Sequence, residues 1–122
     1  MVERSETESA LSIVEKNFNE KQFEKVISIT LASGDLKFKY PVMLLYQGIA
    51  YRELGEYTNA LESFSEFGLI SDLDTNLMYW HQGLVYLKAD DPEKARETFS
   101  KIDQNGSFKG EADVKEILDS LK

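Results

Sequence analysis

The chain has 122 residues, a net charge of −8 and no cysteine. This length allows one domain around one core. The excess of acidic side chains argues against binding to nucleic acid or to an anionic membrane surface, because both attract clustered Lys and Arg. Without cysteine there is neither a disulfide nor a thiolate metal site.

The sequence holds no apolar run near the roughly 20 residues that span a bilayer. Its first residues, 1–6, are acidic and polar, unlike a signal peptide. We therefore expect a cytoplasmic protein without direct membrane insertion. If the chain was excised from a longer one, a periplasmic or membrane-tethered location becomes the alternative.

The first half of the chain predicts three helices. Apolar residues at helical spacing predict a helix over about 5–19 and a second over about 22–32. Gly34 is expected to end the second helix in a left-handed conformation. Pro41 suits the first turn of a third helix that stops near Gly55. The stripe of the second helix that we expect to be buried consists of Phe23, Val26, Ile27 and Leu31.

The second half predicts four more helices. They cover about 57–67, ending at Gly68, then 75–88, a stretch from Pro92 to about 103, and 110–121. Asp91 before Pro92 is typical of a helix N-cap followed by proline in the first turn. The pattern contains no strand, and connections this short force neighbouring helices to lie antiparallel.

A pentapeptide is repeated within these helices. Residues 47–51, Gln-Gly-Ile-Ala-Tyr, recur 35 residues later at 82–86 as Gln-Gly-Leu-Val-Tyr. Such a period marks stacked helical units whose product is a surface. Glycine within a helix costs about 1 kcal/mol relative to alanine, so Gly48 and Gly83 are predicted where two helices approach closely. At the same offset Ala60 recurs as Ala95, which we expect opposite the glycines, and Phe64 as Phe99, which we expect between successive units.

These residues resemble the tetratricopeptide repeat, a helix–turn–helix unit of about 34 residues. The resemblance implies an all-α TPR-like solenoid of three antiparallel helix pairs plus a C-terminal capping helix, within a single domain over 1–122. The units are a degenerate one at about 7–40, then 41–74 and 76–109, with the capping helix at about 110–121. The first unit departs from the pattern, with Val14 in place of glycine and Thr30 in place of phenylalanine.

The sequence favours binding over catalysis. His81 is the only histidine, so it lacks a second histidine for a metal pair, and no nucleophile–base pair or phosphate loop accompanies it. The stretch 72–76 resembles the start of a calcium loop but lacks its glycine and its final glutamate. Asn105-Gly106-Ser107 matches a glycosylation triplet and is better explained as a turn. We predict no enzyme activity, no cofactor and no metal.

The resemblance also implies where a partner docks, because the first helix of each unit lines the concave face in this family. The family's clamp for a C-terminal carboxylate uses Lys, Arg and Asn, and none of these stands at the corresponding positions. Those positions are Leu11, Glu15, Tyr46, Leu77 and His81. A chaperone-tail binder of that type is therefore not expected.

The exposed stripe of these helices instead predicts an apolar groove for a peptide or an amphipathic helix. Trp80 is the expected energetic anchor. Two alternatives stay open: these side chains pack on one another or beneath the last helix, or the groove is a self-association surface. In the second case the chain is a homodimer, or a spacer module of a larger, possibly envelope-associated, protein. The predicted groove consists of Leu45, Ile49, Arg52, Leu77, Trp80, Leu84 and Leu87.

Overall fold

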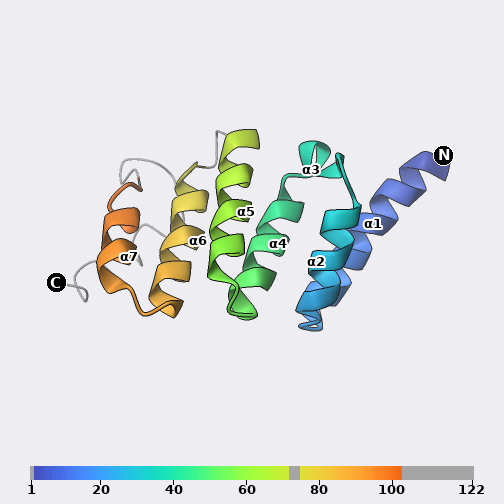
Figure 1. Ribbon diagram of the computed structural model, residues 1–122. Coiled ribbons are helices and arrows are strands. Elements are labelled where there is room, and N and C mark those ends of the chain that lie inside the picture. Colours follow the sequence, from blue (N-terminus) through green and yellow to red (C-terminus); the bar gives the residue numbers. More distant parts are fainter. Residues whose placement is uncertain (1, 72–74, 103–122) are drawn as a thin grey trace.

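The computed structural model describes residues 2–71 and 75–102, and within these ranges every regular element is a helix. The helices run up and down in a row from the N-terminal to the C-terminal end (Figure 1). This confirms the predicted all-α repeat fold. The elements are α1 (Val2–Asn19), α2 (Phe23–Ala32), α3 (Leu36–Lys39), α4 (Val42–Glu53), α5 (Tyr57–Ile70), α6 (Thr75–Lys88) and α7 (Pro92–Phe99).

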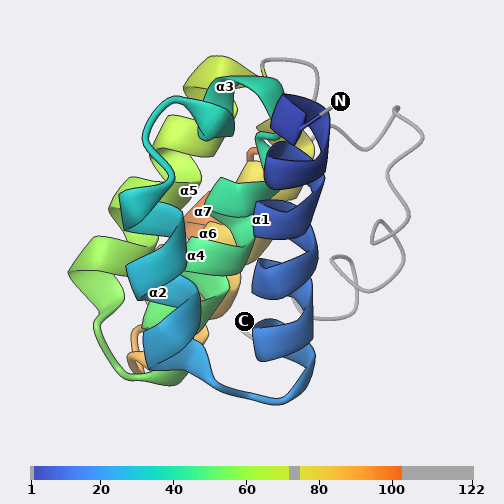
Figure 2. The ribbon, with the colours of Figure 1, turned by 90° about the vertical axis from the view of Figure 1, so that its right-hand side faces the viewer.

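The helices pack as consecutive antiparallel pairs. Each long helix contacts the next one in the row, and the first helices of the pairs, α1, α4 and α6, also contact one another in order. Figure 2 looks along this row from its N-terminal end, with α1 and α2 nearest the viewer and the later pairs behind them. The first helices thus share one side of the array, and it is on this side that the predicted groove lies.

Most predicted helix boundaries are confirmed. Gly34 and Gly55 follow α2 and α4 with φ of +58° and +79°, the left-handed conformation that glycine adopts without steric cost. The helix predicted over 75–88 is α6, with the same ends. Asp91 caps α7 by accepting a hydrogen bond from the Lys94 amide at 3.2 Å, and Pro92 follows it.

Gly48 and Gly83 lie at close helix contacts, as their cost in a helix suggested. A Cβ atom on Gly48 would overlap the ring of Phe64, and one on Gly83 would overlap the ring of Phe99. In each unit the atoms nearest to the glycine belong to the phenylalanine ring of the second helix, and Ala60 and Ala95 on the same helices are fully buried. The glycine is therefore required by the aromatic side chain of its own unit.

Two boundary predictions were wrong. The short helix α3, Leu36–Lys39, was not predicted, because four residues are too few to show a helical period. Helix α5 does not end at Gly68 but continues to Ile70. Gly68 is buried inside the helix, where a Cβ atom would overlap the sulfur of Met78 on α6. It is a third close-packing glycine, and a glycine directly after the apolar face of the predicted helix resembled a helix stop.

Leu31 was wrongly predicted to be buried. Its side chain is 61% exposed, whereas Val26 and Thr30 are the buried residues of α2. The helical period of α2 is satisfied by these two residues, so Leu31 faces outward on the flank of the helix. The predicted capping helix lies outside the described residues, and so does the end of the helix predicted to reach 103.

The core is a row of three clusters that follow the helix pairs. The first two clusters join side chains from one pair with those of the next, since α4 contributes to the first and α6 to the second, and the third lies within α6–α7 and the residues that follow. This nearest-neighbour packing is the pattern of a repeat array. The buried members are Val14, Val26, Met43 and Ala50; Ala60, Phe64 and Val85; and Ala95, Phe99 and Ile102.

Candidate functional site

The predicted groove residues lie on two helices that contact each other. Leu45, Ile49 and Arg52 belong to α4, and the other four belong to α6. All seven side chains are half-buried, so none is freely exposed and none is lost in the core. We call the surface made by these seven residues the α4–α6 face.

Most apolar residues of this face also support the core. Leu45 and Ile49 pack against the cluster around Phe64. Trp80 packs on Phe99, with the ring centroids 5.5 Å apart and the planes at 50°. Leu84 and Leu87 join the same C-terminal cluster as Trp80. These side chains therefore have a structural role whether or not a partner covers them.

Leu77 differs from its apolar neighbours on the α4–α6 face. It is half-buried, yet it packs against none of the three core clusters found among the described residues. A change at Leu77 should consequently disturb the surface more than the fold. It is the best position at which to separate the two roles of this face.

A polar pair crosses the α4–α6 face and was not foreseen from the sequence. The ring of His81 stacks on Phe64 at 5.1 Å with 19° between the planes. Its Nδ1 lies 3.4 Å from Nη1 of Arg52. Because a guanidinium only donates, this nitrogen of His81 accepts, and the proton of the neutral ring sits on Nε2.

Burial lowers the pKa values of both members of this pair. Desolvation, aided by the charge of Arg52, lowers the pKa of His81 to about 4, so the ring is neutral at pH 7. Desolvation also lowers the pKa of Arg52, partly opposed by Glu53. From the sequence we expected a surface or partly buried histidine instead of a ligand or a base, and the ring is half-buried. Its contact with Arg52 joins residues 29 positions apart and left no local signal.

A second cross-link secures the same end of α4 and α6. Lys88 Nζ donates to Glu53 Oε2 at 2.8 Å, and the Tyr57 hydroxyl donates to the Lys88 carbonyl at 3.3 Å. Glu53 also lies 3.9 Å from the Arg52 guanidinium. One end of the α4–α6 face is therefore charged: the cations of Arg52 and Lys88 both lie beside the carboxylate of Glu53.

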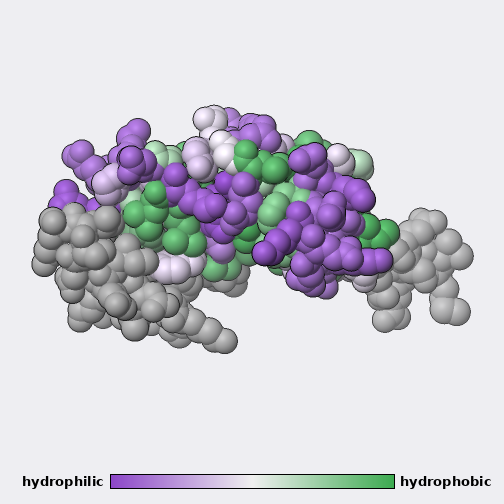
Figure 3. All heavy atoms as spheres, turned by 90° about the horizontal axis from the view of Figure 1, so that it is seen from below, coloured by the Kyte–Doolittle hydropathy of each residue, from purple (hydrophilic) through white to green (hydrophobic). Residues whose placement is uncertain are grey.

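The lower ends of the helices show how apolar and polar surface alternate. In Figure 3 hydrophilic side chains cover much of the view, and apolar patches open between them. Within the described residues no group of three His, Cys, Asp or Glu side chains is placed to hold a metal ion. No helix in those ranges is long and apolar enough to cross a membrane. The calcium-like stretch is only partly described, and the glycosylation triplet lies outside the described residues.

Comparison with known families decides the architecture. The model of the tetratricopeptide repeat family matches residues 43–68 and 78–105. The chain is a tetratricopeptide repeat protein. The two matched stretches correspond to α4–α5 and to α6–α7 with the residues that follow. Comparisons with curated proteins and with solved structures find no match.

Tetratricopeptide repeats act as protein–protein interaction modules and are typically not enzymes. The helix pair α1–α2 lies before the first matched stretch and packs against α4.

Proposed function

We propose that this repeat protein binds a peptide or an amphipathic helix of a partner protein on the α4–α6 face. The observation that carries the proposal is the set of apolar side chains left half-exposed on two contacting helices, beside the half-buried guanidinium of Arg52. Docking would complete the burial of surface that the core covers only in part.

The support behind this face makes it suited to binding. The cross-links of Arg52 to His81 and of Glu53 to Lys88 hold α4 and α6 in a fixed relation. A rigid surface loses little conformational entropy when a ligand docks, so more of the contact energy appears as affinity. We expect the ligand to place apolar residues along the helices and an acidic or polar residue near Arg52.

Leu77→Glu gives the sharpest test. Peptides selected from a random phage-displayed library on the wild-type protein are titrated calorimetrically against wild type, Leu77→Glu and Ile13→Glu. Ile13 lies on α1, is 47% exposed and is not part of the α4–α6 face, so it serves as a matched control. We expect Leu77→Glu to weaken binding by about tenfold or more, since a charge would enter the apolar contact, and Ile13→Glu to leave it unchanged. Unchanged binding by Leu77→Glu, or an equal loss in Ile13→Glu, would refute the proposal.

Trp80 remains the expected anchor but makes a poorer test. Its contact with Phe99 means that Trp80→Ala should weaken the fold as well as the binding. Self-association of the chain through the same face is checked by sedimentation velocity at micromolar concentration. A dimer that Leu77→Glu dissociates would make a second copy the occupant of the face, and a strict monomer would exclude it.

A further inference from the structure

The large apolar side chains that are most exposed do not belong to the α4–α6 face. Among the described residues they are Leu69 at 85%, Leu31 at 61% and Phe38 at 60% exposure. Leu69 and Leu31 lie on α5 and α2, the second helices of their pairs, and Phe38 lies on the short α3 between α2 and α4. Such side chains gathered away from the expected binding face call for a separate explanation.

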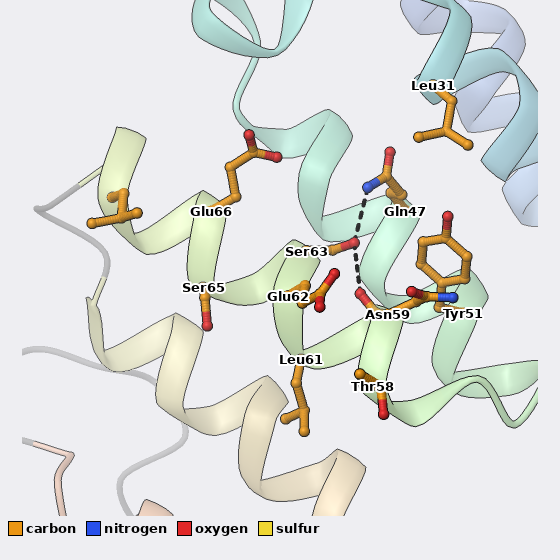
Figure 4. Close-up of a pocket in the computed structure, with 11 residues that line it drawn as sticks. Leu31, Gln47, Tyr51, Thr58, Asn59, Leu61, Glu62, Ser63, Ser65 and Glu66 are labelled. Carbon is orange, nitrogen blue, oxygen red and sulfur yellow. Dashed lines mark hydrogen bonds between the residues drawn. The ribbon is translucent and has the colours of Figure 1, made fainter.

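Leu31 and Leu69 line one cleft. It has a volume of about 660 Å³ and is bordered by α2, α4 and α5, with Tyr51 and Leu61 adding apolar surface (Figure 4). A smaller cleft of about 210 Å³ adjoins it and shares Leu31 with it. The two form one depression along the second helices of the first two pairs.

Two buried polar side chains of the cleft, Gln47 and Ser63, are bonded to each other. Gln47 Nε2 donates to Ser63 Oγ at 2.9 Å, and Ser63 Oγ donates to the Asn59 carbonyl at 3.0 Å, as the dashed lines in Figure 4 show. This chain of bonds ties α4 to α5. The floor is therefore rigid and needs no polar ligand, which leaves apolar contact and charge to select an occupant.

The charge of the cleft is negative. Glu62 and Glu66 line the larger cleft, where no described Lys or Arg does, and Asp35, Lys37 and Glu66 line the smaller one. Glu66 is paired with Lys37 at 2.6 Å, whereas Glu62 has no ion-pair partner among the described residues. The pKa of Tyr51 is raised by burial and then by Glu56 and Glu62, as expected at negative potential.

We propose that this cleft is a second docking surface, separate from the α4–α6 face, for a basic amphipathic segment of a partner protein. Apolar side chains of that segment contact Leu31 and Leu69, and a Lys or Arg reaches Glu62. Charge selects this occupant over a second copy of the chain, because the protein carries a net charge of −8 and would bring like charges to the cleft.

Two synthetic amphipathic peptides test the charge preference, one of leucine and lysine and one of leucine and glutamate. Each is titrated into the ¹⁵N-labelled chain, with amide shifts mapping the contact and fluorescence anisotropy giving the affinity. We expect the leucine–lysine peptide to bind, with shifts concentrated at Leu31, Glu62 and Leu69. Equal binding of the leucine–glutamate peptide would overturn the proposal. Shifts confined to Leu77 and Leu84 would also overturn it, and would instead support the function proposed for the α4–α6 face.

Charge-reversed variants separate the cleft from the general negative charge. Glu62→Lys should weaken the leucine–lysine peptide roughly five- to tenfold, and added salt should reduce the difference. Glu20→Lys makes the same change in net charge at an exposed turn outside the cleft and should have less effect than about twofold. Similar losses in both variants would show binding to the overall charge and refute the site.

Leucine substitutions then test the apolar contact. Leu69→Ser removes a cleft residue, and Ile13→Ser removes a side chain on α1 that is 47% exposed and lies outside the cleft. Only Leu69→Ser should weaken the peptide. Equal effects of the two substitutions would contradict a specific cleft.

Discussion

The α4–α5 pair and the α1–α2 pair build buried contacts with different side chains at corresponding positions. In α4–α5 the first helix supplies Gly48 and the second supplies the ring of Phe64, which is fully buried. At the corresponding positions α1–α2 has Val14, also fully buried, and Thr30. In α4–α5 the side-chain volume at these positions comes from the second helix alone, whereas in α1–α2 both helices contribute to it.

The extent of the family match follows the same division. The matched stretch begins at residue 43, after α1–α2, although that pair packs against α4. In α1–α2 valine and threonine together supply a side-chain volume similar to that of glycine and phenylalanine, and total volume is what a core requires. The fold tolerates the exchange because each pair contacts only its neighbours.

Among the substitutions that test this difference, Phe64→Ala should have the largest effect on the free energy of unfolding. The variant loses the contact with Gly48 and the stacking on His81, and we expect a loss of about 3–5 kcal/mol in the free energy of unfolding. Thr30→Ala, the control in the first pair, should lose only about 1 kcal/mol, the value of the hydrogen bond from its hydroxyl to the Ile27 carbonyl. Urea denaturation followed by circular dichroism measures both. Equal losses would mean that the two pairs do not divide their bulk as described.

Acid should act on the contact between α4 and α6 and spare the contact between α1 and α4. His81 titrates at about 4 in the fold and at 6.5 in the unfolded chain, so the unfolded chain binds the proton first as pH falls. The stability present above pH 6.5 is lost between pH 6.5 and 4, by roughly 3 kcal/mol at most. The position corresponding to His81 in α4 is Tyr46, which packs on Phe18 and carries no charge there.

The measurement compares urea stability at several pH values for wild type and His81→Gln. Carboxylates titrate in both proteins, so the difference between them isolates the histidine. A difference that does not change between pH 7 and 4.5 would contradict the assigned burial of His81.

Gly48→Ala should cost less, because two effects oppose each other. Alanine favours the helix by about 1 kcal/mol, but its methyl group would push on the Phe64 ring, and overpacking costs about 1–3 kcal/mol. We expect a net loss of up to about 2 kcal/mol. The double variant Gly48→Val with Phe64→Thr imports the arrangement of α1–α2, and it should lose less than the sum of its two single changes. Strict additivity would show that the positions do not exchange volume.

Much of the architecture was predictable because it depends on local signals. The Asp91-Pro92 cap and the glycines at positive φ each act within one or two turns of helix, and the recurrence of Gly48 as Gly83 gives the period of the repeat. The prediction at Gly68 was wrong because a glycine in the last turns of a helix has the same local sequence whether it ends the helix or packs against Met78. Only the neighbouring helix distinguishes the two.

For the candidate site, the sequence predicted which helices carry the residues but not how far each side chain is buried. Helical periodicity correctly put Leu45, Ile49 and Trp80 on helices that share one side. How far each is buried depends on the side chains of the second helices, which the period does not contain. The contact of Arg52 with His81 and the cleft beside Leu31 both arise from residues far apart in the sequence, so neither had a local signature.

The smallest expected effect concerns the helix caps of the two ends of the array. Asp91 caps α7 through the Lys94 amide, whereas Gln22, at the same position before α2, makes no side-chain bond. The backbone at Gln22 has φ −87° and ψ 68°, near the −122° and 74° of Asp91. Gln22→Asp should therefore accept from the Lys25 amide and stabilise the chain by about 0.5–1 kcal/mol.

The matched experiment is Asp91→Ala, which should lower the free energy of unfolding by about 1 kcal/mol because the Lys94 amide loses its acceptor. At the other end Gln22→Asp would provide such an acceptor for the Lys25 amide. Urea midpoints that move in opposite directions by similar amounts would show that the caps of α2 and α7 differ only in their side chains. No gain from Gln22→Asp would instead show that α2 begins with a backbone unsuited to capping. The difference between the two ends of the array would then extend from side chains to helix geometry.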